Sequence, residues 1–232
     1  MFMLTLIEDF ISLFFPRVCN ACEAPLMHNE EIICMSCLFH LPKTNFHKEQ
    51  ENPVSRLFWG RVDIHAAAAC YYFRKGSKIQ HLMHQFKYKG HKEIGVFIGS
   101  LYGDELIKSP CFNTVNAVIP VPLHRKKIKK RGFNQSEQFA MGLSQSMKID
   151  LVTSVLVRKT ASETQTKKTK FKRWENVKEV FDIEQAETLQ GKHILLVDDV
   201  ITTGATIEAC ATVLYQIPGI KVSVAGMAFT TF

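Results

Sequence analysis

The sequence has no long apolar run, no internal repeat and no low-complexity tract, and glycine and proline supply only 12 and 8 of its 232 residues. Residues 1–15 are apolar, but they include Glu8 and Asp9, lack a basic start and are too short to cross a bilayer. We therefore expect neither membrane insertion nor a secretory signal. Phe10, Leu13 and Phe14 follow helical spacing, which predicts an amphipathic helix ended by Pro16.

The composition is typical of a soluble globular protein, because 46% of the residues are hydrophobic. The length suits one large domain, or one domain with a small module. The formal net charge is +7, and the basic residues are concentrated at 125–131 and 167–173. Basic patches attract pyrophosphate groups, nucleic acid or acidic protein surfaces, although many such runs are only solvated faces.

The segment ILLVDDVITTGAT, residues 194–206, is the most informative in the chain. It predicts a buried strand that stops at Asp198 and Asp199, then a hydroxyl- and glycine-rich turn that opens a helix. Such a turn can surround a phosphate with N–H groups, but the lysine of a Walker-type loop is missing. Because carboxylates suit sugar hydroxyls or a cation, the segment indicates a pocket for a phosphorylated sugar. This interpretation requires acids that are not buried in ion pairs and a turn open to solvent.

Four of the seven cysteines form two CxxC pairs that are separated by eleven residues, Cys19/Cys22 and Cys34/Cys37. Four thiolates at this spacing predict a closed tetrahedral Zn²⁺ site with a structural role. A segment of this size buries little core, so the metal would supply its folding free energy. Disulfide pairing is the alternative, and the lack of a secretory signal argues against it.

Strands and helices are expected to alternate after a polar linker at 43–63, which predicts an α/β fold with a parallel sheet and helices on both faces. Ligands in such sheets bind beyond the carboxyl ends of the strands. We expect strands at 65–73, 117–121, 154–157, 194–197 and 221–229, and helices whose buried residues are Ile79, Leu82, Met83 and Phe86; Ile94, Phe97, Ile98 and Leu101; Phe139, Leu143 and Met147; and Ile207, Cys210, Ala211 and Leu214.

Two further segments could bring positive charge to the carboxyl ends of the strands. PVPLHRKKIKKRGFNQ, residues 120–135, follows a strand end, so its basic side chains could surround a pyrophosphate or form a surface stripe for nucleic acid. Residues 160–180 are polar and rich in lysine and threonine. A loop of this length is either a lid that closes over an anionic substrate or a disordered segment.

VDDVITTGAT resembles the 5-phosphoribosyl-1-pyrophosphate (PRPP) motif of type I phosphoribosyltransferases. Together with the Cys₄ start, the basic segment and a loop with Gln165, it resembles the ComF-like competence proteins. The resemblance implies a type I phosphoribosyltransferase fold at 64–232 and a small zinc-ribbon module with an N-terminal helix at 1–45. It implies ribose binding by Asp198 and Asp199, and 5-phosphate binding by Thr202, Thr203, Gly204, Ala205 and Thr206.

The implied reaction displaces pyrophosphate from ribose C1, with Mg²⁺ bound to PRPP and an oxocarbenium-like transition state. Cationic side chains would hold the leaving group: Arg125, Lys126, Arg131, Lys168 and Arg173. Two alternatives stay open, namely a PRPP-sensing scaffold without catalysis and a module for single-stranded DNA. The family implies a cytoplasmic protein with a role in DNA uptake and a competence helicase as partner. The acceptor and the oligomeric state are not predicted.

Overall fold

The computed structural model describes residues 16–159 and 180–230. Its elements are α2 (Met35–His40), η1 (Phe46–Lys48), η2 (Ser55–Phe58), β1 (Ala67–Phe73), α3 (Lys78–Tyr88), α4 (Glu93–Leu106), β2 (Ala117–Pro120), α5 (Arg125–Arg131), α6 (Gln135–Met147), β3 (Asp150–Leu151), β4 (Leu156–Arg158), β5 (Phe181–Ile183), η3 (Ala186–Leu189), β6 (His193–Ile201), α8 (Ala205–Leu214) and β7 (Lys221–Thr230). The expected helix before Pro16 lies outside the described residues. No helix in the described ranges is long and apolar enough to cross a membrane.

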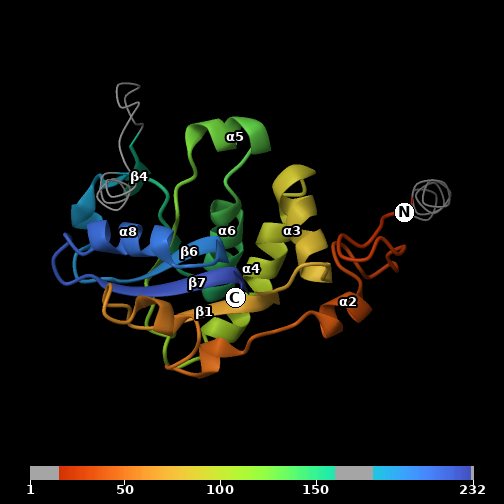
Figure 1. The fold of residues 1–232 in the computed structure, drawn as a ribbon, viewed down its shortest axis with the longest axis horizontal. Coiled ribbons are helices and arrows are strands. Elements are labelled where there is room, and N and C mark those ends of the chain that lie inside the picture. The colour runs from red at the N-terminus through yellow and green to blue at the C-terminus, as the bar shows by residue number, and fades with distance from the viewer. Residues whose placement is uncertain (1–15, 160–179, 231–232) are drawn as a thin grey trace.

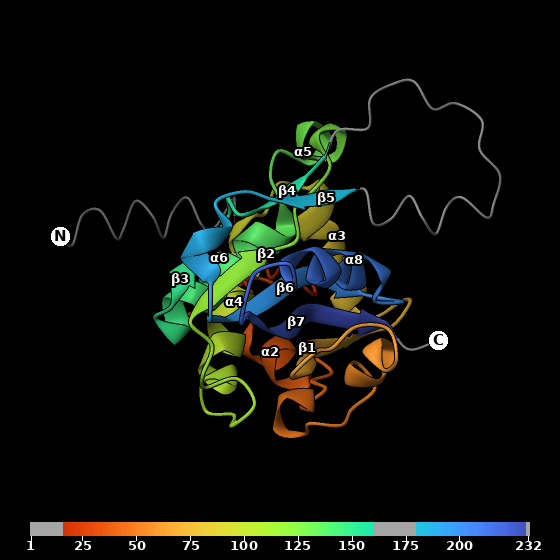
Figure 2. The same cartoon turned by 90° about the vertical axis from the view of Figure 1, so that its left-hand side faces the viewer.

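The main sheet has five parallel strands in the order β1-β7-β6-β2-β3, which confirms the predicted α/β class (Figure 1). From the centre of the sheet the chain runs outward in both directions, from β6 to β7 and from β2 to β3. Because crossover connections are right-handed, α8 and α6 lie on opposite faces (Figure 2). The carboxyl end of β2 lies beside β6 just before the acidic pair, since Pro120 is in register with Val197.

Apolar spacing predicted most of the helices and their buried faces. In α3, the four residues expected to be buried are at most 3% exposed. In α6 and α8 the expected core residues are also buried. Helix α6 begins where predicted, because the Asn134 side chain accepts a hydrogen bond from the Ser136 N–H and caps the first turn.

Helix α4 exists as predicted, but part of its predicted buried face is wrong. Phe97 and Leu101 are only half-buried, whereas Gly95, Gly99 and Gly103 are buried. A Cβ atom on Gly99 would lie 2.3 Å from the Phe139 carbonyl oxygen, and one on Gly142 would lie 2.1 Å from the Val96 carbonyl oxygen. Phe139 and Gly142 belong to α6, so α4 and α6 pack backbone against backbone. The glycines of α4, spaced four residues apart, allow this close approach.

The predicted strands differ from the structure in two places. The strand at 154–157 is found as β4, but it pairs antiparallel with β5 outside the main sheet, and the fifth sheet strand is β3. The strand predicted to stop at the acidic pair continues to Ile201. Asp198 and Asp199 therefore lie in the last part of β6, which is still paired with β7, rather than after the end of the strand.

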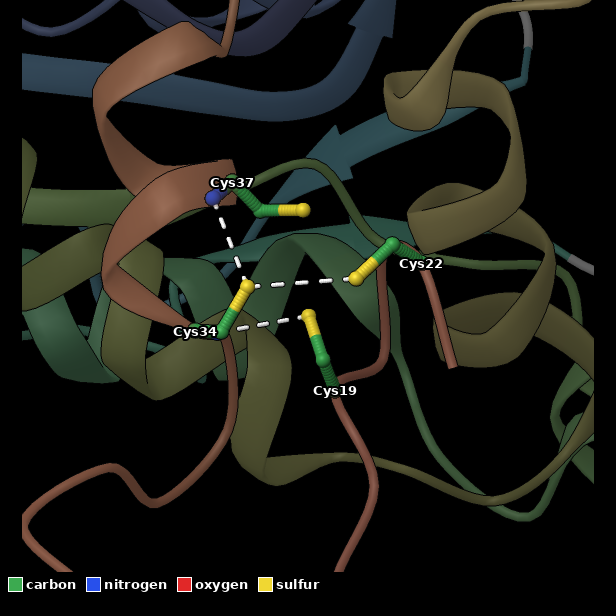
Figure 3. Close-up of side chains that lie close together, drawn as sticks. All are labelled: Cys19, Cys22, Cys34 and Cys37. Carbon is green, nitrogen blue, oxygen red and sulfur yellow. Dashed lines mark hydrogen bonds between the residues drawn. The ribbon is translucent and has the colours of Figure 1, made fainter. Parts of the chain in front are cut away.

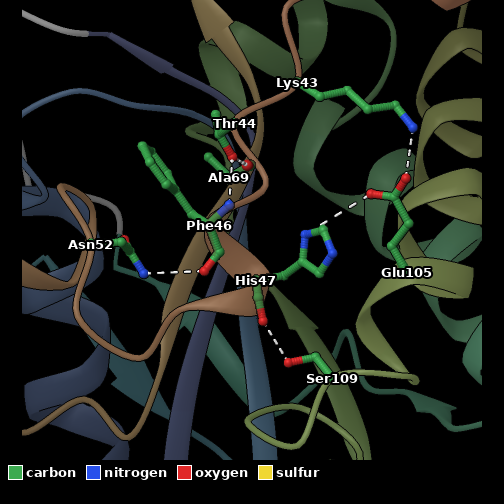
Figure 4. Close-up of polar contacts among 8 residues, drawn as sticks. All are labelled: Lys43, Thr44, Phe46, His47, Asn52, Ala69, Glu105 and Ser109. Atoms are coloured by element: carbon green, nitrogen blue, oxygen red, sulfur yellow. Dashed lines mark hydrogen bonds and ion pairs between the residues drawn. The ribbon is translucent and has the colours of Figure 1, made fainter.

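Residues 43–63, expected as a linker, pack closely against the sheet. Asn52 is 1% exposed, and its side-chain amide donates to the Phe46 carbonyl (Figure 4) and also to the carbonyls of Glu49 and Ala67. The Ser109 hydroxyl donates to the His47 carbonyl on the other side of this segment. The linker prediction is wrong because polar side chains here satisfy buried backbone groups instead of facing water. The predicted boundaries at 45 and 64 stay predictions.

Candidate functional site

Two adjacent carboxylates lie on β6 near its carboxyl end and have different partners. Because successive side chains on a strand point in different directions, Asp198 and Asp199 have different neighbours. The Ser136 hydroxyl at the start of α6 donates to Asp198 over 2.9 Å, and the Asp199 N–H donates to the same carboxylate oxygen over 2.8 Å. Burial and the neighbouring Asp199 charge nevertheless raise the pKa of Asp198 to about 7.

Asp199 forms an ion pair that the sequence analysis did not predict. Its carboxylate lies 2.8 Å from the Lys87 ammonium at the end of α3, and the two side chains are 14% and 18% exposed. The expectation of an acidic pair without ion partners is therefore wrong for Asp199. Asp198 has no ion pair among the described residues. The pair at Asp199 keeps some solvent contact and lies at the strand edge where ligands of such sheets bind.

The turn after β6 is open to solvent, as expected for a phosphate site. Thr202, Thr203, Ala205 and Thr206 are exposed, while Gly204 is buried at the start of α8. Gly204 has a φ of 74°, and a Cβ atom there would lie 2.9 Å from the Phe58 ring. Glycine is therefore required twice, by the backbone conformation and by the contact.

Arg61 supports this turn from the segment that was expected to be a linker. Its guanidinium donates to the Thr203 carbonyl over 2.9 Å and pairs with Glu208 on α8. It also donates to the Leu57 carbonyl in its own segment. Arg61 thus fixes the backbone of the exposed turn, while the threonine side chains of the turn are open to solvent.

The basic segment forms a short exposed helix, α5, which projects from one end of the molecule (Figures 1 and 2). Six of its seven residues are basic and none is buried. Arg125 and Lys126 are exposed. Arg131 is half-buried, donates to the Gln135 side chain over 2.7 Å, and lies 5.6 Å from the centre of the Tyr88 ring.

Arg131 contacts Tyr88, and the preceding residue, Lys87, pairs with Asp199. The last turn of α3 therefore lies between Arg131 and the acidic pair in this series of contacts. Within the described ranges the structure shows no direct contact of Arg125, Lys126 or Arg131 with the acidic pair. Lys168 and Arg173, predicted to hold pyrophosphate, lie outside the described residues, as does Gln165.

The cysteine cluster lies in the N-terminal module, beside α3 (Figures 1 and 3). The sulfur atoms of Cys19, Cys22, Cys34 and Cys37 all lie within 4.8 Å of one another, and the Cys22 and Cys34 sulfurs are 3.8 Å apart. Tetrahedral Zn–S bonds of about 2.3 Å require sulfur separations of about 3.8 Å. All four cysteines are free thiols, so the disulfide alternative is not observed.

Backbone N–H groups favour the thiolate form of Cys19, whereas burial raises the pKa of Cys34 and raises that of Cys37 to about 12. The N–H groups of Ala21 and Cys34 donate to the Cys19 sulfur over 3.4 and 3.3 Å. Burial works against ionisation of Cys19, but these donors outweigh it and lower its pKa to about 7. The donor set therefore fits a closed Zn²⁺ site.

The chain is similar to known proteins, and one family model covers the region of the acidic pair. The phosphoribosyl transferase domain family matches residues 128–220, which include the acidic pair and the turn. The DNA utilization protein YhgH of Escherichia coli K12 is 27% identical over 207 residues, which cover 86% of this chain and 84% of that protein. The competence protein ComFC of Bacillus subtilis is 30% identical over 137 residues, which cover 57% of this chain and 51% of that protein. The chain therefore carries a phosphoribosyl transferase domain and is similar to proteins named for DNA utilization and competence.

Among solved structures, the glutamine PRPP amidotransferase of B. subtilis aligns with a TM-score of 0.41 at 17% identity, covering 61% of this chain and 30% of that one. The family model matches the β6–α8 region directly, whereas the cysteine cluster and α3 precede the matched residues.

Lys87, Ser136 and Arg61 were not predicted as parts of the site. Ser136 directly follows the basic segment at 120–135, so its place near the strand end could have been inferred. Lys87 follows the apolar face of α3 and carries no local sign of its partner. Arg61 lies in a segment whose polarity indicated a linker, so no sequence signal connected it to Thr203.

Proposed function

We propose that the chain binds PRPP with Mg²⁺ at the end of β6 and transfers the phosphoribosyl group to a nucleophilic acceptor. The observation that carries the proposal is the acidic pair followed by an exposed turn whose backbone is fixed by Gly204 and Arg61. Carboxylates accept hydrogen bonds from ribose hydroxyls, and a turn at a helix start binds phosphate. The match to a phosphoribosyl transferase domain supports the same ligand.

In this proposal Asp198 and Asp199 orient the ribose, and the 202–206 turn holds the 5-phosphate. The bond between C1 and the pyrophosphate oxygen breaks, the acceptor forms a new bond to C1, and pyrophosphate leaves with the bonding electrons. Mg²⁺ and basic side chains would stabilise the negative charge on the leaving pyrophosphate. Arg131 is the first candidate, and Arg125, Lys126, Lys168 and Arg173 are further candidates. Both carboxylates would also balance positive charge that develops on the ribose ring.

We further propose that Cys19, Cys22, Cys34 and Cys37 bind a structural Zn²⁺ and that the module at 1–45 is a zinc ribbon joined to a domain at 64–232. A bound zinc ion supplies folding free energy to a module with little core of its own. The four thiolates complete its tetrahedral shell, so this ion would take no part in phosphoribosyl transfer.

The binding proposal is tested by titrating Mg²⁺–PRPP into the full chain in a calorimeter. Wild type is expected to bind, while Asp199→Asn is expected to abolish binding with its zinc content unchanged. Equal binding by the variant would refute the site. Release of labelled pyrophosphate in the presence of candidate bases and amines then separates a transferase from a PRPP sensor.

A second candidate function is favoured by α5. Five of its six basic residues are exposed and none is buried, which suits a nucleic-acid backbone as well as a pyrophosphate. Relatives named for DNA utilization and competence support a DNA-related role, which we place in the cytoplasm. In this reading the chain is a scaffold that binds single-stranded DNA beside a competence helicase, with PRPP as a regulator. Oligonucleotide binding that falls steeply with salt and survives Asp198→Asn would support it.

A further inference from the structure

Lys87 holds a position that a purely structural lysine rarely occupies. Its ammonium lies 2.8 Å from Asp199, with 18% of its side chain exposed, at the edge of the sheet where the phosphate turn begins. Neutralising one of two adjacent carboxylates is favourable while the site is empty, because their charges repel. A ribose that donates hydrogen bonds to Asp199 must compete with this lysine for the same oxygens.

The backbone that carries Lys87 is fixed on both sides. Phe86 is fully buried, and its ring centre lies 5.7 Å from that of Phe133. The Tyr88 ring lies under the Arg131 guanidinium. The anchors leave only the four-carbon arm of Lys87 free to move, and a lysine arm reorients at little cost because its ammonium carries three rotatable donors.

The anchors also determine where the arm can reach. Lys87 pairs with Asp199 on β6, and the next residue, Tyr88, contacts Arg131 of the basic segment. In the proposed complex the released arm of Lys87 would turn toward this segment. A ligand with a sugar over the acidic pair would place its C1 substituent beyond the sugar, away from the phosphate turn. A lysine released from Asp199 on that side meets the anionic substituent rather than bulk solvent alone.

We propose that Lys87 is an exchangeable counter-ion that pairs with Asp199 in the empty site and moves to the pyrophosphate when PRPP binds. This inference rests on the proposed PRPP site and names a pyrophosphate-binding residue outside the matched domain residues. The charge of Lys87 is then used twice. It offsets acid repulsion before binding, and it stabilises the leaving group afterwards. The Mg²⁺ that accompanies PRPP and the ribose hydroxyls replace it at Asp199.

The test compares two ligands that differ only in the C1 pyrophosphate. Mg²⁺–PRPP and ribose 5-phosphate are titrated into wild type, Lys87→Met and the matched control Lys89→Met, whose side chain is exposed on the same helix end. We expect Lys87→Met to weaken PRPP by about tenfold or more, since a charge-assisted contact is lost. Ribose 5-phosphate should bind this variant at least as well as wild type, and Lys89→Met should change neither ligand.

Equal weakening of both ligands, or no change for PRPP, would overturn the exchange. Wild type that binds neither ligand would instead refute the proposed function, so the two failures are distinguishable. Reductive ¹³C-methylation of the lysines gives a second readout if ribose 5-phosphate binds too weakly for calorimetry. The Lys87 methyl resonance, assigned with Lys87→Met, should move further with PRPP than with saturating ribose 5-phosphate, and equal movement contradicts the proposal.

Discussion

The cysteine cluster and the acidic pair are the two proposed ligand sites, and they are built in opposite ways. The cluster takes its four sulfurs from two short CxxC turns, and neighbouring backbone N–H groups orient them. The acidic pair depends on side chains from distant parts of the chain, because Lys87 and Ser136 come from α3 and α6. A local site needs its metal to be stable, whereas a site assembled from several elements depends on the core that places them.

The largest effect is expected from Cys34→Ser. Changes to the surroundings of metal ligands cost about 10- to 100-fold in affinity, so losing a ligand itself should cost at least about a hundredfold. Zinc per chain and chelator competition measure the change, with Cys111→Ser as control because that thiol lies apart from the cluster. The proposed independence of the two sites also predicts that PRPP affinity survives, and a parallel loss of both would contradict it.

The acidic pair should make the free energy of unfolding depend on pH through Asp198. The folded-state pKa of Asp198, about 7, lies above the ordinary value of 3.8. The folded state therefore holds the proton more tightly, and stability falls as pH rises from about 4 to about 7. Asp198→Asn should remove this penalty and stabilise the chain at pH 8 by up to about 4 kcal/mol, with no gain at pH 4.

Denaturant unfolding at both pH values measures this difference. Asp150→Asn is the control, because its side chain is 75% exposed on a short edge strand. A gain in stability that does not depend on pH would show that burial of charge is not the cause.

The same contrast explains what the sequence could predict. CxxC spacing and the VDDVITTGAT motif are local patterns, so the metal site and the turn were recognised, and apolar spacing predicted α3, α6 and α8. Contacts between distant elements carry no local pattern. The Lys87–Asp199 pair, the burial of residues 43–63 and the glycine contact between α4 and α6 were therefore missed. The failure at α4 arose because glycine is not counted as apolar, although its small size decides the packing there.

A glycine pair separates conformation from contact at the phosphate turn. Gly204 and Gly90 have φ values of 74° and 82°, but a Cβ atom meets the Phe58 ring only at Gly204. Both alanine variants should lose about 1 kcal/mol from backbone strain, and Gly204→Ala should lose about 1–3 kcal/mol more from the clash. Thermal unfolding measures the difference, and ligand affinity should fall for Gly204→Ala alone. Equal costs at the two positions would mean that Phe58 yields without strain.

The smallest effect is expected from Arg61→Ala, which weakens the turn without touching the ligand. Arg61 donates to the Thr203 carbonyl and pairs with Glu208, and its side chain is 30% exposed. A partly exposed ion pair contributes at most about 1 kcal/mol, so stability should change little. Because the turn loses its support from behind, affinity for Mg²⁺–PRPP should fall by about two- to fivefold. Arg56→Ala is the matched control, since Arg56 contacts the exposed Trp59 ring rather than the turn. Equal affinities for the two variants would mean that β6 and α8 hold the phosphate turn without help from residues 43–63.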